Sequence, residues 1–507
     1  MPVDVAMNTQ THATTLGALF DAVPAGCDNV PVSGIAYDSR RVQPGDVFFA
    51  IPGEVADGRR FVPAAVNAGA VAVVAEQEVD ADVPVIMVDS TRRAMAEASL
   101  RFWGHPDRAV TLIGPTGTNG KSTVAAGLKH VLTAAGMATG LIGTLTYEWG
   151  QQSIEASRTT PESRDLIEML ARMRQDDIAA AAIEVSSHAI ALDRVYGLTF
   201  AGAIFTNMTR DHLDYHRTME EYRRVKLQHF EKLESAAFAA INIDDPHAEH
   251  FLEAASHARI IRYSTRDTDA DVYVNVTDES LDGSRGTIHI DGNDYEFRSP
   301  LWGAFNHSNI AAITAGAHGM GCAPNAIAEG LGSFAGIIGR CQHVDSTAPF
   351  SVYVDFAHTP DALNAVLSAV RPLVAGRLLV LFGCGGDRDR GKRPEMAQAV
   401  ERWADVIYLT SDNPRSEDPL RIIDDVQQGF SAGTHVRCEP DRIRAIEQSI
   451  ADAEPGDVVF LCGKGHEATQ NIAGVLHPMN DWETAARILA ARGHAPQTSS
   501  GGGNTPG

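Results

Sequence analysis

The chain has 507 residues, more than one hydrophobic core usually accommodates, so its length predicts roughly two to four domains. Hydrophobic residues make up 44% of it and charged residues 21%, which is ordinary globular composition. The formal net charge of −23 argues against broad nucleic-acid or membrane binding, because both call for a basic surface. An anionic substrate stays compatible with this charge, since local basic groups and Mg²⁺ can hold one.

The chain carries no signal for a membrane or for secretion. No apolar run is long enough to span a bilayer, and the first residues lack the basic region and apolar core of a secretory signal. The six cysteines are scattered without a Cys-x-x-Cys pair, which favours reduced thiols over a disulfide framework or a zinc site. We therefore expect a cytoplasmic protein without nucleic-acid or membrane partners.

Residues 1–106 contain short strand-like and helical runs separated by turn signals. The stretch "GIAYDSRRVQPGDVFFAIPG" predicts a strand, a loop and a second strand. "FVPAAVNAGAVAVVAE" predicts a helix, a stop at Gly69 and a buried strand. No cluster of catalytic residue types is evident in this region.

From Ala109 the pattern becomes α/β. "AVTLIG" predicts a buried strand, and "KSTVAAGLKHVLTAAG" a helix that ends at Gly136. "AAAAIEVSSH", "AGAIFTN" and "AAFAAINIDD" are apolar runs followed by polar residues, as expected for a parallel sheet covered on both faces. Residues 271–298 predict a small antiparallel patch.

A third region follows Gly339. "SVYVDF", "RLLVLFGCGG", "DVIYLTSDNPR" and "DVVFLCGKGHE" predict strands that each run into a polar loop, with helices between them. The low-complexity end predicts a disordered tail. We thus predict an α/β protein of three domains, with boundaries at 1–106, 107–339 and 340–495, and a disordered tail at 496–507.

The stretch "LIGPTGTNGKST" predicts a phosphate-binding loop with unusual spacing. Five residues separate Gly114 from Gly120, where the common pattern has four. Gly117 and Gly120 let backbone N–H groups approach a phosphate, and the helix that starts near Lys121 adds positive potential. Lys121 can reach the terminal phosphates and Ser122 can ligate Mg²⁺. The alternative is a plain Gly-rich turn, but Gly-Lys-Ser between a strand and a helix favours a nucleotide site.

Metal-binding candidates follow two other strands. Glu184 in "IEVSSH" sits where a Mg²⁺ ligand would lie beside a phosphate loop, although a carboxylate at a strand boundary needs no function. "TNMTRDHLDYH" has two His and two Asp, a density at which a metal site is conceivable, although the stretch alone favours a solvated polar loop. The phosphate loop on a neighbouring strand favours the metal site. Lys226 reads as an ordinary lysine of an amphipathic helix.

The loops of the third region combine basic and acidic groups. "FGCGGDRDRGKRP", with Arg388, is the most basic loop of the chain and favours an anion site over a solvated charge run. In "TSDNPRSEDP", Arg415 can fork onto a carboxylate while Asp412 and Asn413 accept from an amine. With Glu467 of "CGKGHE", these residues predict a pocket for a zwitterion.

Taken together, these motifs resemble the Mur ligase family. "TGTNGKST", "EVSSH", "TNMTRDHLDYH", "NHSNIAAITA", "DFAHTPDAL", "GCGGDRDRGKRP", "SDNPRSEDP" and "GKGHE" occur in the family's order over about residues 30–490, and the family's ATP loop has the lengthened spacing. The resemblance implies an N-terminal UDP-substrate domain, a central P-loop ATPase domain and a C-terminal Rossmann-like amino-acid-binding domain.

The resemblance also implies an activity and its cofactors. It implies an ATP-dependent ligase that adds meso-diaminopimelate to UDP-N-acetylmuramoyl-L-alanyl-D-glutamate through an acyl phosphate, in peptidoglycan precursor synthesis. The alternatives are L-lysine as the added amino acid, and, in another class, a non-catalytic nucleotide-binding regulator. The implied partners are the small-molecule substrates, including ATP, with Mg²⁺ as cofactor and a monomer as the expected state.

Matching motifs carry the family's ATP and metal roles onto this chain. Ser122 and Glu184 would ligate one Mg²⁺, and His212 with Lys226, carbamylated as N6-carboxylysine, a second. The catalytic residues implied are Lys121, Glu184, His212 and Lys226. The implied ATP-binding residues are Thr116, Gly117, Thr118, Asn119, Gly120, Lys121, Ser122, Asn306, Asn309, Arg340 and Asp355.

Substrate contacts are implied in the same way. Two positions depart from the family pattern, since Arg158 stands where Asn is usual and Leu192 where Gln is usual. The implied contacts of the UDP-substrate are Tyr37, Ser39, Asp57, Gly58, Arg158, Thr159, Thr160, Ser186, Leu192 and Arg194. The implied contacts of diaminopimelate are Arg388, Asp412, Asn413, Pro414, Arg415, Gly463 and Glu467.

Overall fold

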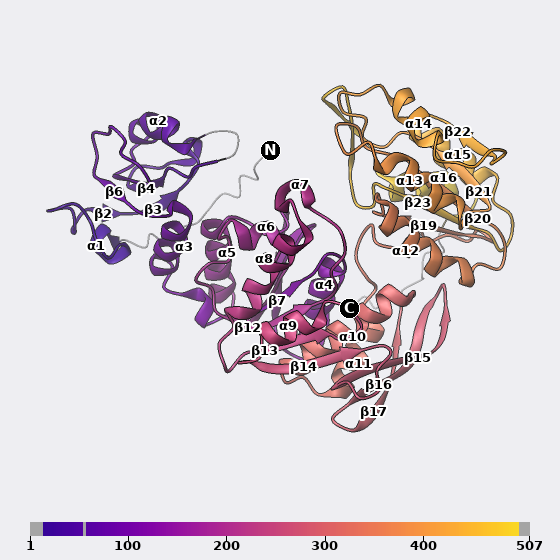
Figure 1. The fold of residues 1–507 in the computed structure, drawn as a ribbon, viewed down its shortest axis with the longest axis horizontal. Helices are drawn as coiled ribbons and strands as arrows, with labels where there is room; N and C mark the ends of the chain where they lie inside the picture. Colours follow the sequence, from indigo (N-terminus) through magenta and orange to yellow (C-terminus); the bar gives the residue numbers. More distant parts are fainter. Residues whose placement is uncertain (1–13, 54–56, 496–507) are drawn as a thin grey trace, which may run out of the picture. The chain divides into compact units, whose positions relative to one another are not determined.

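The computed structural model describes residues 14–53 and 57–495, which form two compact units (Figure 1). The first unit contains the chain up to residue 275 together with 286–298 and 308–334. The second contains 276–285, 299–307 and the chain from residue 335. The predicted tail, 496–507, lies outside the described residues.

The N-terminal part of the first unit is built on a parallel four-stranded sheet in the order β3-β4-β5-β6. Its strands are short apolar runs, and the predicted strand–loop–strand and helix–strand pairs are both present. The strands are β1 (Thr14–Thr15), β2 (Pro31–Val32), β3 (Gly34–Ala36), β4 (Asp46–Phe49), β5 (Ala72–Ala75) and β6 (Val85–Met87). The helices are α1 (Leu16–Leu19), η1 (Ser39–Arg41), η2 (Gly58–Phe61), α2 (Val62–Asn67), α3 (Thr91–Phe102) and η3 (Pro106–Arg108).

The centre of the first unit is a mainly parallel sheet that begins β10-β9-β8-β11-β7-β12-β13-β14. Its inner strands are buried on both faces, as their continuous apolar runs predict. The strands are β7 (Thr111–Thr116), β8 (Thr139–Ile142), β9 (Thr146–Trp149), β10 (Gln152–Glu155), β11 (Ala180–Ile183), β12 (Phe200–Phe205), β13 (Phe238–Asn242) and β14 (Arg259–Ser264). The helices are α4 (Lys121–Ala134), α5 (Ser163–Gln175), α6 (Ser187–Ala191), α7 (Leu213–His216), α8 (Met219–Glu231), α9 (Ala248–Ala254), α10 (Ala304–Gly319) and α11 (Pro324–Ser333).

Three further strands extend this sheet in the order β15-β16-β17. They are β15 (Val272–Ser280), β16 (Gly283–Ile290) and β17 (Asn293–Ser299). Turns of only two residues join them, which antiparallel neighbours alone allow. The antiparallel patch predicted at 271–298 is therefore present, and the division between the two units falls within it.

The second unit is built on a six-stranded sheet in the order β18-β19-β23-β20-β21-β22, parallel apart from β18. Its core includes Trp302, whose ring lies 5.6 Å from that of Tyr353 and 6.4 Å from that of Phe460. The strands are β18 (Gln342–His343), β19 (Ser351–Asp355), β20 (Leu378–Phe382), β21 (Val406–Leu409), β22 (Val436–Cys438), β23 (Val458–Cys462), β24 (Thr469–Ile472) and β25 (Val475–Pro478). The helices are α12 (Pro360–Val370), η4 (Arg371–Leu373), α13 (Lys392–Glu401), α14 (Pro419–Gln427), α15 (Arg442–Ala451) and α16 (Asp481–Ala491).

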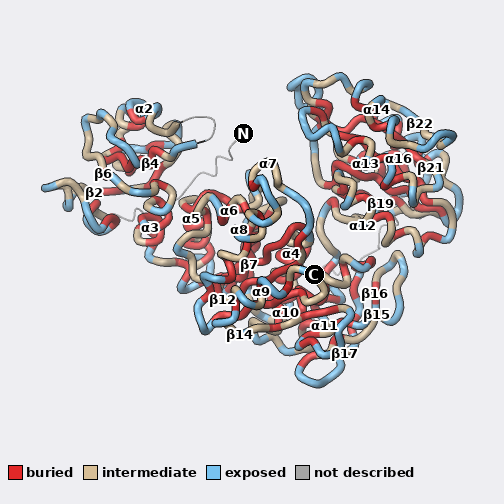
Figure 2. Tube along the Cα trace, viewed as in Figure 1, coloured by how far each residue is buried: buried red, intermediate tan, exposed pale blue. Residues whose placement is uncertain are grey.

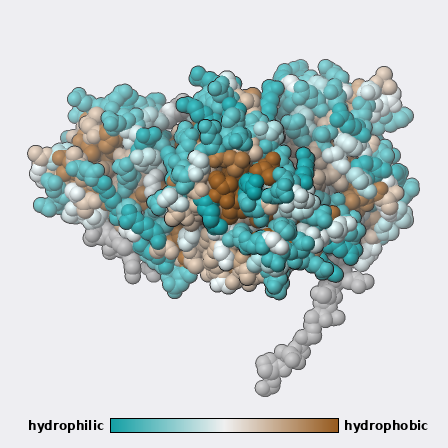
Figure 3. Space-filling model, turned by 60° about the horizontal axis from the view of Figure 1, so that its bottom comes forward, coloured by the Kyte–Doolittle hydropathy of each residue, from teal (hydrophilic) through white to brown (hydrophobic). Residues whose placement is uncertain are grey.

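The buried residues follow the strands and the inner faces of the helices, while exposed residues gather in loops and on outer helix faces (Figure 2). The face drawn in Figure 3 is largely hydrophilic, apart from apolar areas near its centre and toward its left end. Among the described residues, no helix combines the length and the apolar character that crossing a membrane requires. The α/β fold class with parallel sheets and a small antiparallel part is confirmed.

Candidate active site

Two glycines shape the predicted phosphate loop between β7 and α4. Gly117 has φ 150° and Gly120 has φ 86°. A Cβ on Gly117 would lie 2.0 Å from Thr206 Oγ1, and one on Gly120 would lie 2.4 Å from Asn309 Oδ1. Only glycine fits at these two positions, so the loop runs close to the end of β12 and to α10.

Asn207 and the lysine of the loop fix its conformation. The N–H groups of Thr118 and Asn119 donate to the carbonyl and side-chain oxygens of Asn207, both at 2.9 Å. Lys121 Nζ bends back and donates to the carbonyls of Gly117 and Thr118, at 3.0 and 2.9 Å. The first N–H groups of α4 have no acceptor within the helix, so this end of the loop favours an anion.

Glu184 lies beside the phosphate loop, at the place predicted for a Mg²⁺ ligand. Its side chain is almost fully buried and accepts from Ser122 Oγ at 2.9 Å and from the N–H of Thr144 at 2.7 Å. A Cβ on Gly143 would come within 2.5 Å of Glu184 Oε1, so that glycine leaves the space for the carboxylate. A hydroxyl and a carboxylate on one side of a phosphate loop suit Mg²⁺.

Within the described ranges, no group of three or more His, Cys, Asp or Glu side chains is arranged to hold a metal ion. Ser122 and Glu184 would therefore share a Mg²⁺ ion with other oxygen ligands. Mg²⁺ usually keeps several waters and shares substrate phosphates, so a pair of protein ligands fits the way this ion binds.

Lys226 is buried, not solvated. Its Nζ donates to Gly117 O at 2.8 Å and to Thr116 Oγ1 at 3.4 Å, and lies 4.8 Å from the centre of the Tyr222 ring. Burial holds the pKa of this amine well below its usual range, and the neighbouring Lys121 lowers the pKa further. The structure thus brings Lys226 against the phosphate loop, as the resemblance implies.

The loop "TNMTRDHLDYH" separates its two histidines. His212 is partly exposed, with its ring 4.9 Å from that of His188 and 6.1 Å from that of Tyr222, the residue that also contacts Lys226. His216 is buried, and its Nε2 lies 2.9 Å from Ser187 Oγ. Burial and the nearby His188 lower the pKa of His216 to about 4. His216 also lies near Tyr222, with its ring 5.2 Å from the tyrosine ring, so both histidines lie on the same side of α8 as Lys226 and differ in burial.

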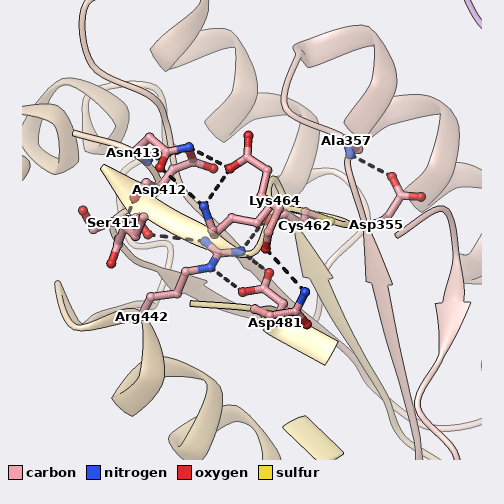
Figure 4. A network of polar contacts seen from close by, with 12 residues as sticks. Asp355, Ala357, Ser411, Asp412, Asn413, Arg442, Cys462, Lys464 and Asp481 are labelled. Carbon is pink, nitrogen blue, oxygen red and sulfur yellow. Dashed lines mark hydrogen bonds and ion pairs between the residues drawn. The ribbon is translucent and has the colours of Figure 1, made fainter. Parts of the chain in front are cut away.

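The second unit carries most of the predicted nucleoside contacts. Asn306 donates to Trp302 O at 2.9 Å. The Asp355 carboxylate accepts from the N–H groups of Cys341 at 2.7 Å and Ala357 at 2.8 Å (Figure 4). These bonds fix the start of the loop that follows β19 and hold it to the segment before β18. Arg340 lies over the Phe356 ring, 4.9 Å from its centre.

The predicted uridine contacts lie beyond the carboxyl ends of β3 and β4, which are parallel neighbours. Tyr37 donates a short hydrogen bond to Asp165 of α5, and its pKa is raised, mainly by burial. Ser39 begins η1. Asp57 caps η2 by accepting from Arg59, whose guanidinium lowers the pKa of Asp57 to about 2. A Cβ on Gly58 would lie 2.6 Å from backbone atoms of residue 51, so the turn needs glycine.

The predicted peptide contacts are gathered between α5 and α6. Thr160 Oγ1 donates to Glu184 O at 2.6 Å and lies 3.3 Å from Ser186 Oγ, and Arg194 donates to Thr160 O at 3.1 Å. Thr159 is joined to the Glu184 group through Thr144, at 3.2 Å. Four of the predicted site residues, Thr159, Thr160, Ser186 and Arg194, thus meet beside the candidate Mg²⁺ ligand.

Glu162 joins the two positions that depart from the family pattern. Its nearly buried carboxylate pairs with Arg158 at 3.1 Å, Arg194 at 3.1 Å and Arg92 of α3 at 2.7 Å. Arg92 also reaches Leu192 O at 3.5 Å. Three guanidinium groups around one carboxylate leave a local excess of positive charge, which suits an anionic substrate.

The residues of the predicted zwitterion pocket lie after β21 and β23 (Figure 4). Asn413 donates to Glu467 at 2.8 Å, and a Cβ on Gly463 would lie 2.8 Å from Asp412 Oδ2. Lys464, which is fully buried, donates to Glu467 at 2.7 Å, to Thr469 O at 2.7 Å and to Asn413 at 3.4 Å. The side chains of Glu467 and Asn413 are therefore held in place by the buried ammonium group of Lys464.

The basic loop after β20 is largely neutralised by its own ion pairs. Arg390 and Arg393 both bind Glu417, at 2.7 and 2.8 Å, whereas Arg388 is exposed. Arg415, which follows Pro414, adopts φ 52° and donates to Gly386 O at 2.8 Å, so it tethers the pocket to this loop.

Comparison with known proteins places these features in one family. The model of the Mur ligase family catalytic domain matches residues 31–103, the Mur ligase middle domain matches 116–317, and the Mur ligase glutamate ligase domain matches 339–465. A relative from Solibacter usitatus is 43% identical over 470 residues, covering 91% of this chain and 94% of the relative. The chain belongs to the Mur ligase family.

Relatives of this Mur ligase carry one shared name. The Solibacter protein and a relative from Chlorobium phaeobacteroides, 41% identical over 93% of this chain and 95% of its own length, are both named UDP-N-acetylmuramoyl-L-alanyl-D-glutamate–2,6-diaminopimelate ligase. A solved structure with that name is 32% identical, with a TM-score of 0.72 over 95% of this chain and 100% of its own.

Some residues of the site of this Mur ligase were not indicated by their local sequence. Lys226 was implied by the family resemblance alone, but its spacing could have shown it, because it falls on the buried face of α8 with Tyr222, Val225, His229 and Phe230. Asn207 and Lys464 lie within "TNMTRDHLDYH" and "GKGHE", and Thr144 and Arg92 lie outside the motifs. Only the fold brings these four residues to their partners.

Proposed function

We propose that this protein is an ATP-dependent ligase that adds meso-diaminopimelate to UDP-N-acetylmuramoyl-L-alanyl-D-glutamate, for peptidoglycan precursor synthesis. The observation that carries the proposal is the group of polar residues after β21 and β23 in a family member 43% identical to a protein of that name. Asn413 donates to Glu467 there, and Arg415 in the same loop donates to Gly386 O. The six cysteines are all free, in keeping with the cytoplasmic location that we expect. A monomer remains our expectation.

The first half of the reaction would take place at the phosphate loop. The glutamyl carboxylate attacks the terminal phosphorus of ATP, ADP leaves, and an acyl phosphate forms. Lys121 would turn from the carbonyls of Gly117 and Thr118 to the phosphates, where its charge offsets that of the transferring group. The cluster of Thr160, Ser186 and Arg194 would orient the peptide beside Glu184.

Mg²⁺ would be held by Ser122 and Glu184, and a second ion by His212 and Lys226. Bound there, Mg²⁺ neutralises phosphate charge. Lys226 as an amine cannot ligate Mg²⁺, which prefers oxygen. The lowered pKa of Lys226 supplies the neutral amine that attacks carbon dioxide, and loss of one proton then leaves an anionic carbamate.

In the second half, the amine of the incoming amino acid attacks the acyl carbon, and phosphate leaves through a tetrahedral intermediate. Diaminopimelate differs from L-lysine by a second carboxylate at its far end. Arg415 and Arg388 offer guanidinium groups to that carboxylate, whereas a lysine pocket would place acidic or neutral groups there. Where the bound amino acid itself covers these donors, an analogue that leaves them unpaired can be rejected by a factor on the order of 10⁴.

A competition assay tests the choice of amino acid. Purified protein receives UDP-dipeptide, ATP and equal concentrations of both amino acids, and the products are identified by mass spectrometry. We expect incorporation of diaminopimelate alone. Incorporation of lysine at a comparable rate would overturn the amino-acid assignment and leave the ligase class intact.

Lys121→Ala tests the reaction class. We expect loss of turnover with an unchanged melting temperature, because the side chain packs on loop carbonyls and not in the core. Release of ADP and phosphate should require both the UDP-dipeptide and the amino acid. ATP binding by the wild type without this coupled release would favour the non-catalytic regulator.

A further inference from the structure

Two charged side chains in the second unit are completely buried and bind each other. Arg442 opens α15 and Asp481 opens α16, and the side chains of both have 0% exposure. Arg442 Nε and Nη2 donate to the two Asp481 oxygens at 2.8 and 2.6 Å. An arginine at a helix N-terminus gains nothing from the helix dipole, so this placement needs a different explanation.

The remaining donors of Arg442 reach two backbone carbonyls beneath the amino-acid pocket. Nη2 donates to Cys462 O at 2.9 Å and Nη1 to Ser411 O at 3.4 Å (Figure 4). Cys462 ends β23 and directly precedes Gly463, while Ser411 follows β21 and directly precedes Asp412. Arg442 therefore contacts the backbone one residue before two of the predicted pocket residues.

The hydrogen bonds between strands do not join the loop after β21 to the loop after β23. In the strand order, β20 lies between β23 and β21, so the loops that follow these two strands are not joined by a ladder. The two loops nevertheless approach closely, because a Cβ on Gly463 would lie 2.8 Å from Asp412 Oδ2 and 4.0 Å from Arg442 Nη2. The rigid fork of one guanidinium spans the gap, with Asp481 fixing its orientation.

We propose that Arg442, held by Asp481, is a positioning residue that sets the separation of the two loops forming the amino-acid pocket. The inference rests on the proposed function, since it assigns a role at that same pocket. Arg442 does not touch the amino acid in this account. It acts through the backbone of Ser411 and Cys462, and so through the orientation of Asp412 and Gly463.

Arg442→Lys is the first test, because lysine keeps the charge but cannot bind two carboxylate oxygens and two carbonyls at once. Arg377→Lys is the matched control. Arg377 also binds an aspartate, Asp457, with Nε at 3.0 Å and Nη2 at 2.6 Å, but at the residues before β20 and β23, the opposite edge of the sheet.

Steady-state kinetics are measured with whichever of the two amino acids the wild type incorporates. Losing a hydrogen bond to a charged group changes an equilibrium constant by roughly tenfold or more. We therefore expect Arg442→Lys to raise KM for the amino acid about tenfold, while KM for ATP stays within about twofold of the wild-type value. Arg377→Lys should leave both values unchanged. Equal rises of both KM values, or a wild-type KM for the amino acid, would overturn the proposal.

Two further measurements guard against a folding defect and against failure of the proposed function. The double variant Arg442→Met with Asp481→Leu replaces the buried pair by apolar groups, which often preserves stability. It should melt like the wild type and still show the raised KM. Amide hydrogen exchange, which needs no substrate, should increase at residues 411–415 and 463–467 in Arg442→Lys but not in Arg377→Lys. Unchanged exchange there would contradict the proposal even if the wild type used neither amino acid.

Discussion

Lys226 places its amine where an ammonium ion is poorly stabilised. The side chain is buried, its Nζ has a backbone carbonyl and a threonine hydroxyl as partners, and Lys121 lies close enough to lower its pKa. The acidic group that raises that pKa is Asp211, and its effect is the weakest of the three causes. These surroundings favour the neutral amine, which is the form that reacts with carbon dioxide.

We predict that Lys226→Ala loses most of its ligase activity and regains part of it when a short carboxylic acid such as acetate is added. The small carboxylate would occupy the volume of the deleted side chain and supply the missing anionic oxygens. Activity is measured over a series of acetate concentrations, with Lys232→Ala as the control for a lysine near the end of the same helix. Full activity of Lys226→Ala without acetate would remove the carbamate from the mechanism.

His229 predicts a pH dependence of stability. Burial lowers its pKa from 6.5 to about 4, and its Nε2 lies 3.1 Å from Gly114 O. Between these pH values the unfolded chain binds a proton that the folded chain does not, so stability falls as the pH decreases from 6.5 towards 4 and is retained above 6.5. The linked loss is about 3 kcal/mol for a pKa difference of this size.

His229→Gln removes the titrating group and keeps an N–H donor for the carbonyl of Gly114. We expect the free energy of unfolding, measured by urea denaturation at several pH values, to depend less steeply on pH between 4 and 6.5 than in the wild type. The same slope in both proteins would assign the acid sensitivity to other groups.

At the scale of elements, α3 and α5 are joined through charge as well as through packing. Arg92 at the start of α3 binds the nearly buried Glu162 at the N-cap position of α5, while the neighbouring Arg93 binds Asp193 with 56% of its own side chain exposed. The two arginines are adjacent in sequence, but only one of them has a buried partner.

Arg92→Gln should therefore lower the free energy of unfolding by about 1–3 kcal/mol, because it removes a charged donor from a buried carboxylate. Arg93→Gln should change it by less than about 1 kcal/mol, as for other exposed pairs. Chemical denaturation of the two variants gives both values. Equal effects would mean that Arg158 and Arg194 already satisfy Glu162.

The elements were predictable from the sequence wherever apolar runs and turn signals agree. The strands at β7, β11, β12, β13 and β20 follow from continuous apolar runs, and α4 follows from its glycine-bounded helix, which ends at Ala134 just before Gly136. The phosphate loop was also predictable, because its residues are contiguous. Partners far apart in sequence were not. Arg92 and Glu162, or Arg442 and Asp481, meet only through the fold, and no local pattern marks them.

At the scale of the whole molecule, the chain does not complete one unit before it starts the other. It passes between them after residues 275, 285, 298, 307 and 334. The predicted domain boundary near residue 340 therefore remains a prediction. The two compact units divide the chain differently, because segments 276–285 and 299–307 belong to the second unit. The core of the second unit takes Trp302 and the partly buried Leu281 from the segment that joins β15 to α10.

Because the chain alternates between the two units, fragments cut at the predicted domain boundaries lose part of a core. A fragment of residues 340–495 would lack Trp302, whose ring packs against Tyr353 and Phe460, and removing a buried tryptophan side chain typically costs about 3–5 kcal/mol. We expect that fragment to bind a hydrophobic dye and to melt without a cooperative transition, whereas a fragment of residues 276–495 should melt cooperatively. A cooperative transition in the shorter fragment would show that the borrowed tryptophan is dispensable. The predicted amino-acid pocket is then best studied in the intact chain, because the unit that carries it takes part of its core from the segment between β15 and α10.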